Sequence, residues 1–329
     1  MALLTELSLA AAAPLVQTFG VDLKRIEPLS VGSVNSNFRL TDRTGKIYFA
    51  RLYEEQDHVG AVREHAIVAA LDDAGVPVVR ALQRRDGGSL ADFDGKAFAM
   101  FPWVDGEILC QARVTPAHCF ALGAALARVH SCSGRAPTLP EGRFRIPDLR
   151  ERLKKVEAAG RASLLPAVSL IRSKLDQYEA ARVPGLERGI CHGDLFRDNV
   201  LWRGGQLAAL LDFESVCANN FAYDLMVTAL AWCYGNAFQL PLVQALFDGY
   251  RSARPVPAAE ASALRSEGAI ACLRFASTRL TDFSLRVADG AEPVRDFRRF
   301  LARLAAIEAG ALDPCIASLG AQREHATGA

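Results

Sequence analysis

The sequence of 329 residues predicts an α+β fold with two lobes, a small sheet-rich one followed by a larger, mainly helical one. Half of the residues are hydrophobic, which is enough to bury a sizeable core and favours two lobes over one at this length. Short apolar segments separated by turn residues fill residues 25–101. Longer segments with helical periodicity fill most of the chain after them.

The first third of the chain has the pattern of β-strands interrupted by one helix. Val31–Leu40 and Lys46–Tyr53 flank a turn-rich segment, and two more strands are expected at Val78–Leu82 and Lys96–Phe101. A helix is expected over His58–Ala74, because a glycine and then a proline follow it. Its expected buried face consists of Val62, Ile67, Ala70, Leu71 and Ala74.

The segment Phe101-Pro102-Trp103-Val104-Asp105-Gly106 marks a change from strands to helices. We therefore predict an N-terminal lobe over residues 1–100, a hinge over residues 101–106 and a C-terminal lobe over residues 107–329.

The C-terminal lobe is expected to be mainly helical. One helix should begin at Thr115-Pro116 and continue to about His130, and two more should occupy residues 148–182. Residues 219–310 also have helical patterns, broken near Arg254-Pro255-Val256-Pro257 and near Asp289-Gly290. A short strand-rich segment covers residues 189–213.

The composition argues against several classes of function. The chain carries 38 basic and 37 acidic side chains, which gives no electrostatic case for nucleic acid or an anionic membrane as partner. Its eight cysteines form no C-x-x-C pair, which argues against a disulfide framework and a zinc site. The apolar start lacks a basic region and is expected to be a helix ending at Gly20, so we expect a soluble, cytoplasmic protein.

The most informative segment is His192-Gly193-Asp194-Leu195-Phe196-Arg197-Asp198-Asn199. It precedes two short apolar runs around Gly204-Gly205, a pattern that predicts a β-hairpin. The hairpin would place Asn199, at its start, near Asp212, at its end. A short loop can bring the carboxylate of Asp194 beside them, so that three oxygen-bearing side chains converge.

These three side chains suit phosphoryl transfer, which depends on positioning and on neutralising charge. Mg²⁺ prefers oxygen ligands and takes one or two of them from protein, so Asn199 and Asp212 can supply an amide and a carboxylate oxygen. Asp194 is then free to orient an acceptor hydroxyl and take its proton. Each residue alone would more often form a turn, so the prediction depends on their order and spacing.

The same segments resemble the aminoglycoside phosphotransferase and choline kinase superfamily. The segment from His192 to Asn199 is similar to its catalytic loop, and Leu211-Asp212-Phe213-Glu214 to its metal-binding segment. Within it, the sequence looks most similar to homoserine kinases of the ThrB type, through Val34-Asn35-Ser36-Asn37-Phe38, Ala222-Tyr223-Asp224-Leu225 and later blocks. The resemblance implies a protein-kinase-like fold with a nucleotide-binding N-terminal lobe, and it implies ATP and Mg²⁺ as cofactors.

The resemblance also implies how the nucleotide is bound. The loop Gly32-Ser33-Val34-Asn35-Ser36-Asn37 is neither a G-x-G-x-x-G nor a Walker A loop, and alone it would predict an ordinary turn. In this superfamily, Ser and Asn often replace the glycines while main-chain N–H groups face the phosphates. We therefore expect Gly32, Ser33, Asn35 and Asn37 to lie at the phosphates, and main-chain groups near Phe101 and Trp103 at the adenine, although Trp103 could equally be a packing residue.

Supporting roles follow for four more residues. Arg51 stands where protein kinases carry a strand Lys, and Glu64 is its expected partner, either at the nucleotide or as a structural pair. The resemblance implies that His192 braces the catalytic loop and that Asp224 lies under it as a structural acceptor.

The acceptor implied by the resemblance is the side-chain hydroxyl of L-homoserine, a step of threonine biosynthesis. A zwitterionic amino acid needs a cation for its carboxylate and an anion for its ammonium group. The residues expected to line this acceptor site are Arg197, Glu214, Tyr223 and Arg274.

Other acceptors stay open. Choline or ethanolamine would need an aromatic cage, to which Tyr223 could contribute, and an aminoglycoside would need a dense acidic pocket, which the chain after Asp212 lacks. Methylthioribose and hydroxylysine are further alternatives. A nucleotide-binding pseudokinase would be expected to lack Asp194, Asn199 or Asp212, and all three are present. The expected state is a monomer or a homodimer.

Overall fold

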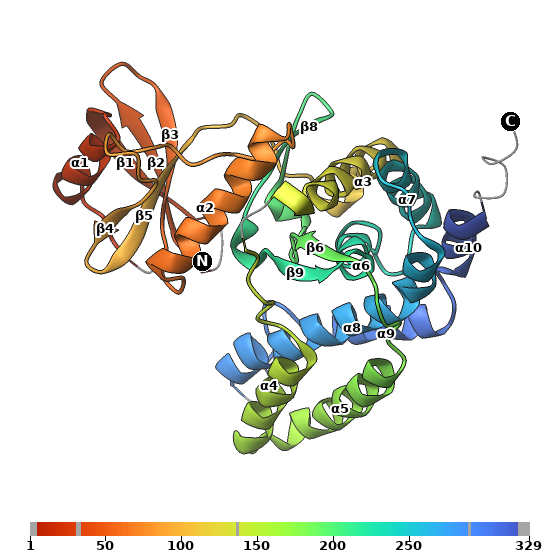
Figure 1. The fold of residues 1–329 in the computed structure, drawn as a ribbon. Helices are drawn as coiled ribbons and strands as arrows, with labels where there is room; N and C mark the ends of the chain where they lie inside the picture. The colour runs from red at the N-terminus through yellow and green to blue at the C-terminus, as the bar shows by residue number, and fades with distance from the viewer. Residues whose placement is uncertain (1–4, 31–33, 136–137, 289–290, 322–329) are drawn as a thin grey trace, which may run out of the picture. The chain divides into compact units, whose positions relative to one another are not determined.

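The computed structural model describes residues 5–30, 34–135, 138–288 and 291–321, and it confirms an α+β fold (Figure 1). The chain divides into two compact units. The sheet unit consists of Met1–Glu107, Arg135–Leu139 and Val200–Glu214, and the helical unit consists of the remainder. The hairpin after the catalytic loop therefore belongs to the sheet unit, and the lobe boundaries at residues 101–106 stay a prediction.

The sheet unit is built on a five-stranded sheet in the order β1-β2-β3-β5-β4, in which all neighbouring strands are antiparallel. Along β3, buried and partly exposed residues alternate, because successive side chains point to opposite faces of a sheet. The strands are β1 (Leu23–Leu29), β2 (Ser36–Asp42), β3 (Ile47–Leu52), β4 (Ala91–Phe93) and β5 (Lys96–Pro102).

Two helices cover this sheet on opposite faces (Figure 1). On β5, Phe98 belongs to the apolar cluster that includes α1 (Leu9–Thr18), whereas its neighbour Ala97 belongs to the cluster that includes α2 (His58–Asp73). The side chain of Asp57 caps the start of α2 by accepting a hydrogen bond from a backbone N–H of the first turn. Ala61 on the buried face of α2 packs in one apolar cluster with Ala97 and Ala99 of β5.

The predicted hairpin is confirmed within the sheet unit. Strands β7 (Val200–Arg203) and β8 (Gln206–Leu210) pair antiparallel. The turn residues Gly204 and Gly205 have φ angles of 58° and 79°, the left-handed values that tight hairpin turns need.

The helical unit has a backbone-to-backbone contact between α3 (Pro116–Ser131) and α7 (Leu240–Ala253). A Cβ atom on Gly123 would lie 2.1 Å from the carbonyl oxygen of Leu246, and one on Gly249 would lie 2.0 Å from that of Phe120. Only glycine at these two positions permits the backbones of α3 and α7 to come so close. The close packing of the two helices brings side chains near their ends together.

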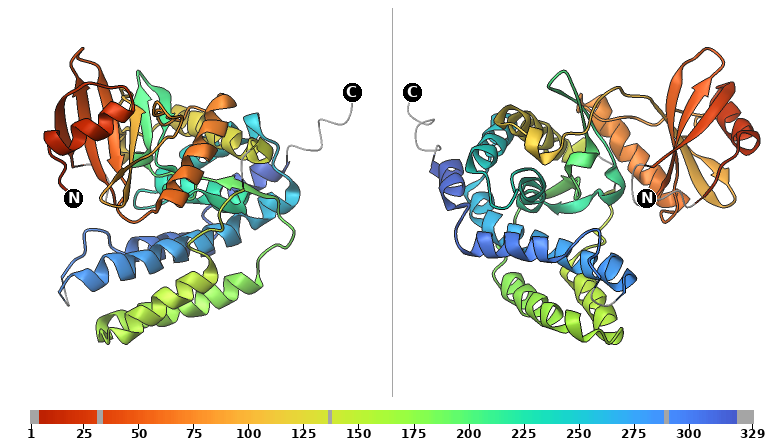
Figure 2. Two further views of the ribbon diagram at one scale, coloured as in Figure 1. Left: turned by 60° about the vertical axis from the view of Figure 1, so that its left-hand side comes forward. Right: turned by 180° about the vertical axis from the view of Figure 1, so that it is seen from behind.

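Helix α8 (Ala258–Asp282) is the longest element of the helical unit. Helices α4 (Ile146–Ala158) and α5 (Leu165–Ala180) lie beside it, as both views of Figure 2 show. The remaining elements are α6 (Phe221–Trp232), α9 (Arg298–Glu308), α10 (Asp313–Ala321) and a two-stranded sheet of β6 (Arg188–Cys191) and β9 (Cys217–Asn220). The helices predicted after residue 115 and the break at Arg254–Pro257 are confirmed, and the break predicted at Asp289-Gly290 lies outside the described residues. None of the helices within the described residues is long and apolar enough to cross a lipid bilayer.

Two sequence-based predictions were wrong, and one strand was missed. Val78–Leu82 forms no strand, because its backbone bonds are irregular: Leu82 N donates to Met100 O of β5, and Val78 makes a single bridge to Leu210. The strand at Leu23–Leu29 was missed, since its polar residues and Pro28 obscure the pattern. Val62 is 53% exposed, because the buried face of α2 also carries polar residues.

Candidate active site

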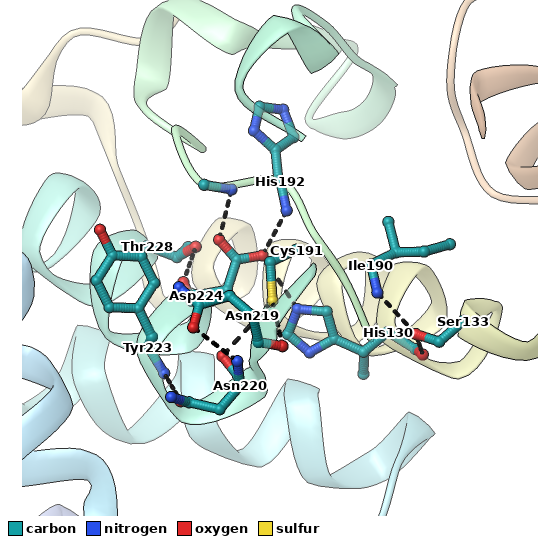
Figure 3. Close-up of polar contacts among 12 residues, drawn as sticks. His130, Ser133, Ile190, Cys191, His192, Asn219, Asn220, Tyr223, Asp224 and Thr228 are labelled. Carbon is teal, nitrogen blue, oxygen red and sulfur yellow. Dashed lines mark hydrogen bonds and ion pairs between the residues drawn. The ribbon is translucent and has the colours of Figure 1, made fainter. Parts of the chain in front are cut away.

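The predicted catalytic loop, His192–Asn199, follows β6 in the helical unit, and Asp224 of α6 holds its start (Figure 3). The two oxygens of this buried carboxylate accept hydrogen bonds from the backbone N–H groups of His192 and Gly193, each at 2.7 Å. Burial alone would raise the pKa of Asp224, but the hydrogen bond from His130 and nearby charge lower it below its ordinary value. The loop is therefore fastened to an ionised group at the start of a buried helix.

His130 supports Asp224 and was missed by sequence reasoning. Its Nε2 atom lies 3.1 Å from Asp224 Oδ2, and its Nδ1 atom lies 2.6 Å from the hydroxyl of Tyr250 on α7. The imidazole stacks on Phe221 with ring centroids 4.4 Å apart. A histidine near the end of an apolar helix was the only signal in the sequence, and that pattern is common in cores.

His192 is fully buried, and its Nδ1 atom accepts a hydrogen bond from the backbone N–H of Asp194 at 3.3 Å. This contact suits the predicted bracing role. Gly193 lies between them with φ 74°, and a Cβ atom there would lie 2.9 Å from the carbonyl oxygen of Ser215. The sharp turn before Asp194 therefore requires glycine.

Arg274 of α8 reaches the same loop. Its NH1 atom donates a 2.7 Å hydrogen bond to the carbonyl oxygen of Gly193 and lies 3.3 Å from Oδ1 of Asp194. The arginine side chain is only 4% exposed, whereas that of Asp194 is 37% exposed. A buried cation thus lies beside a solvent-accessible carboxylate.

Asn199 is oriented in a way that suits a metal ligand. Its side-chain Nδ2 atom donates to the carbonyl oxygen of Asp194 at 2.8 Å, which leaves the amide oxygen as an acceptor. Asn199 belongs to the helical unit and Asp212 to the sheet unit, so their pairing at one metal ion stays a prediction.

In the sheet unit, Asp212 lies two residues beyond β8 with φ 62°, a left-handed value that few residues other than glycine adopt. Its Oδ1 atom is 3.1 Å from NH1 of Arg51, and Nε of Arg51 donates to Oδ1 of Asn37 at 3.3 Å. The predicted nucleotide-loop residue Asn37 is thereby linked through Arg51 to the predicted metal ligand.

Arg51 and Glu64, the pair expected from the sequence, interact through their charges, but they form no close ion pair among the described residues. Among the described residues, the structure pairs Arg51 with Asp212 instead. Glu64 is 5% exposed, and its Oε2 atom has no hydrogen-bond partner there. Burial raises the pKa of Glu64 to about 8 against the opposing effect of Arg51, and the charge of Asp212 raises it too.

The other predicted nucleotide residues take varied positions. Asn35 donates from Nδ2 to Oε2 of Glu214 at 2.9 Å, which fastens the loop to the segment after Asp212. Trp103 donates from Nε1 to Asp105 at 3.1 Å, and Phe101 packs edge-on against the buried ring of His65, 5.6 Å away. Gly32 and Ser33 lie outside the described residues. The nucleotide roles stay predictions.

Two residues predicted at the acceptor make internal contacts. Glu214 accepts from Asn35 within the sheet unit. Arg197 donates from NH1 to Oε1 of Gln111 at 2.6 Å and to the carbonyl oxygen of Ala231. These bonds direct Arg197 into the packing of the helical unit, where it ties the catalytic loop to the end of α6. Gln111 carried no recognisable signal in the sequence.

The helical unit contains a cavity of about 420 Å³ next to the catalytic loop. Its wall includes Gly193 and Arg274 at the loop, and Tyr223 and Ile270 on the helices. Tyr223 is 6% exposed, and burial raises the pKa of its hydroxyl. The charged residues of the wall are Arg143, Arg145, Arg182, Arg188, Arg274, Glu141 and Glu179.

Residues 25–256 match the phosphotransferase enzyme family. The chain is 33% identical to a homoserine kinase of Methylocella silvestris, over 86% of this chain and 88% of that one. It is also 33% identical to a homoserine kinase of Methylobacterium radiotolerans, over 92% of this chain and 95% of that one.

Solved structures share the fold at low sequence identity. An amicoumacin kinase, solved with AMP-PNP and Ca²⁺, superposes with a TM-score of 0.69 at 16% identity, over 93% of this chain and 92% of that one. A choline kinase from Cryptosporidium parvum superposes with a TM-score of 0.65 at 16% identity, over 89% of this chain and 91% of that one. These likenesses show a kinase-like fold.

Proposed function

This chain belongs to the phosphotransferase enzyme family, and we propose that it transfers the γ-phosphate of ATP to the side-chain hydroxyl of L-homoserine. The relatives named homoserine kinase support this acceptor over most of the chain length. Solved neighbours include kinases named for amicoumacin and choline, so the fold alone does not select the acceptor.

The observation that carries the proposal is the charge of the cavity beside the catalytic loop. Five arginines and two glutamates line it, so cationic side chains outnumber acidic ones in its wall. Such a wall favours an acceptor with a carboxylate and disfavours the cations choline, ethanolamine and the aminoglycosides. Homoserine combines a carboxylate with a primary hydroxyl, and this combination suits a cation-lined cavity next to a base.

Asp194 is the proposed base. Its exposed carboxylate can accept the proton of the acceptor hydroxyl as the hydroxyl oxygen attacks phosphorus. Arg274 lies beside this carboxylate and binds the carbonyl oxygen of Gly193, and Asn199 binds the carbonyl oxygen of Asp194. His192 and Asp224 maintain the loop geometry from beneath. An Asp of ordinary proton affinity suffices, because the proton can move late in the reaction.

ATP with a divalent metal ion, Mg²⁺ in this proposal, supplies the phosphoryl group and neutralises its charge. Asn199 and Asp212 would hold the metal ion. Arg51 would contact phosphate oxygens from the position it now shares with Asp212 and Asn37. In this proposal Arg274 and Tyr223 line the acceptor site, while Arg197 and Glu214 act through the internal contacts described above.

The experiment that tests the proposal is ATP consumption by the purified protein, with Mg²⁺, across a panel of acceptors. The panel contains L-homoserine, choline, ethanolamine, methylthioribose, hydroxylysine and kanamycin. Selective turnover of L-homoserine, with O-phosphohomoserine identified by mass spectrometry, supports the proposal. Preferential turnover of choline or kanamycin would contradict it and would show that the arginines of the cavity do not select the acceptor.

A further inference from the structure

Gly193 is held at both of its backbone polar groups. Its N–H donates to Asp224 Oδ1 at 2.7 Å, and its carbonyl oxygen accepts from Arg274 NH1 at 2.7 Å. Asp194, the next residue, therefore has its position set by two side chains from two helices, α6 and α8. A shift of Arg274 moves the carbonyl immediately before the base.

Aromatic rings hold the guanidinium group of Arg274. Its central carbon lies 3.9 Å from the ring centroid of Phe275 and 4.3 Å from that of Phe144. Phe275 stacks on Phe300 with centroids 4.8 Å apart and meets the ring of Phe196 edge-on at 5.0 Å. Phe196 belongs to the catalytic loop, so the same aromatic group orients both the arginine and the loop.

Arg274 also retains hydrogen-bonding capacity beside the cavity. A guanidinium group has five N–H donors, and the catalytic loop uses those of NH1. Among the described residues, the buried Nε atom has no hydrogen-bond partner. A planar fork with an unused edge is the geometry that binds a carboxylate with two parallel hydrogen bonds.

Of the other four arginines of the cavity, Arg143 lies over the ring of Phe144, 5.2 Å from its centroid, and the remaining three have polar partners. Arg182 makes two hydrogen bonds to the buried carboxylate of Glu267, at 2.8 and 2.9 Å. Arg145 pairs with Asp148 at 3.1 Å, and Arg188 bonds to the carbonyl oxygen of Ala218 at 2.8 Å. Each therefore already has a partner, whereas Arg274 joins the cavity to the base.

We propose that Arg274 binds the carboxylate of the acceptor with the donors that the loop leaves free, and so couples recognition of an amino-acid acceptor to the position of Asp194. The inference rests on the proposed function and deepens it. Arg274 is a positioning residue for the base as well as a specificity residue. An acceptor without a carboxylate leaves the buried edge of the guanidinium unpaired and loses rate as well as affinity.

The test compares L-homoserine with 3-aminopropan-1-ol, the same amino alcohol without the carboxylate. For the wild-type enzyme, kcat/KM should be about 10²-fold higher for L-homoserine, and the lower value for 3-aminopropan-1-ol should include a lower kcat. In Arg274→Met, this preference should fall below about threefold, because the variant loses the carboxylate contact. Arg274→Lys, which keeps the charge and loses the fork, should lie between the two.

Arg265→Met is the matched control. Arg265 lies on the same helix, is about half exposed and pairs with Asp313. Its replacement removes the same charge from α8 and should leave the preference for L-homoserine unchanged. If Arg274→Met lowers kcat/KM equally for both acceptors, the arginine has a structural role only and the proposal is overturned. Should Arg274→Met fail to fold, equal wild-type kcat values for both acceptors would overturn the coupling.

Failure of the proposed function is visible separately. If wild-type enzyme phosphorylates neither compound, calorimetric binding of both compounds tests the carboxylate site without turnover. A binding preference for L-homoserine that is reduced, but not abolished, in Arg274→Lys supports the assignment of Arg274. Equal binding of both compounds, or a preference that Arg274→Lys retains in full, overturns it.

Discussion

Arg51 NH1 lies 3.1 Å from Oδ1 of Asp212 in the sheet unit. The contact places the cation of β3 beside the predicted metal ligand, and a third residue, Asn37, accepts from Nε of the same arginine. Protein kinases pair a strand lysine with a helix glutamate, whereas here the larger arginine fork reaches the carboxylate after β8.

Replacing Arg51 should weaken use of ATP. We expect Arg51→Met to lower kcat/KM for ATP about 10²-fold or more, because the variant loses a cation beside the phosphate and metal site. Arg51→Lys should retain part of the activity, since it keeps the charge. Initial rates against ATP concentration measure the effect. Arg39→Met, on the neighbouring strand, is the control, and an Arg51→Met enzyme with wild-type ATP kinetics would show that Arg51 is only structural.

Glu64 should make the stability of the protein depend on pH. Burial raises the pKa of Glu64 to about 8, against about 4.3 for an unfolded chain. Between these values the native state binds more protons than the unfolded state, so the free energy of unfolding falls as pH rises. Glu64→Gln removes this pH-dependent contribution to the free energy of unfolding. The Tm of the variant minus the Tm of the wild type should therefore be larger at pH 8.5 than at pH 5.5.

Glu54→Gln provides the opposite case. Burial would raise the pKa of Glu54, but hydrogen bonds from Lys96, Ser36 and Thr5 lower it below its ordinary value. Its stabilising effect is therefore fully present above pH 5, and Glu54→Gln should lower Tm by similar amounts at pH 5.5 and pH 8.5. A Glu64→Gln variant with the same pattern would contradict the raised pKa.

Loss of the carboxylate under the catalytic loop should damage both stability and rate. Asp224→Asn replaces one accepting oxygen by an amide donor that faces a backbone N–H, so we expect destabilisation of about 3 kcal/mol. The fraction that stays folded should have a reduced kcat, because the loop before Asp194 is no longer held. Thermal unfolding and initial rates measure the two effects. Thr228→Val, one turn along α6, is the control and should lose stability only.

The glycine contact between α3 and α7 predicts a steric effect. Gly123→Ala would place a Cβ atom 2.1 Å from the carbonyl oxygen of Leu246, so the helices must separate. We expect a loss of about 1–3 kcal/mol in the free energy of unfolding, measured with denaturant. Gly134→Ala is matched, because nothing lies within 4 Å of the added atom. Equal stabilities of the two variants would contradict the close approach.

The parts of the fold that could be predicted from the sequence were those with local signals. The hairpin at Gly204-Gly205 and the helix after Thr115-Pro116 follow from turn and capping chemistry, which acts over a few residues. The segment Val78–Leu82 has a strand-like composition, but its backbone partners lie far away in sequence. Whether such a segment joins a sheet depends on which edge is open, and no local pattern contains that information.

In the candidate site, too, local sequence signals predicted some features, and others depend on tertiary contacts. The spacing of Asp194 and Asn199 predicted that both residues lie in one short loop. The hydrogen bond from Asn199 Nδ2 to the carbonyl oxygen of Asp194 agrees with this prediction. The partner of Arg51 could not be predicted, since Asp212 lies 161 residues away. The double contact of Arg274 with Gly193 and Asp194 depends on how α8 packs against the loop, which is likewise a matter of tertiary structure.

The most direct test of the central claim is ATP-dependent formation of O-phosphohomoserine by wild-type enzyme and by Asp194→Asn, followed by ³¹P NMR. We predict formation by the wild type and a loss of about 10³-fold or more in Asp194→Asn, with ATP binding retained. Asp198→Asn, an exposed carboxylate of the same loop, is the control. Wild-type rates in Asp194→Asn would contradict the assignment of the base, and absence of O-phosphohomoserine with the wild type would contradict the assignment of the acceptor.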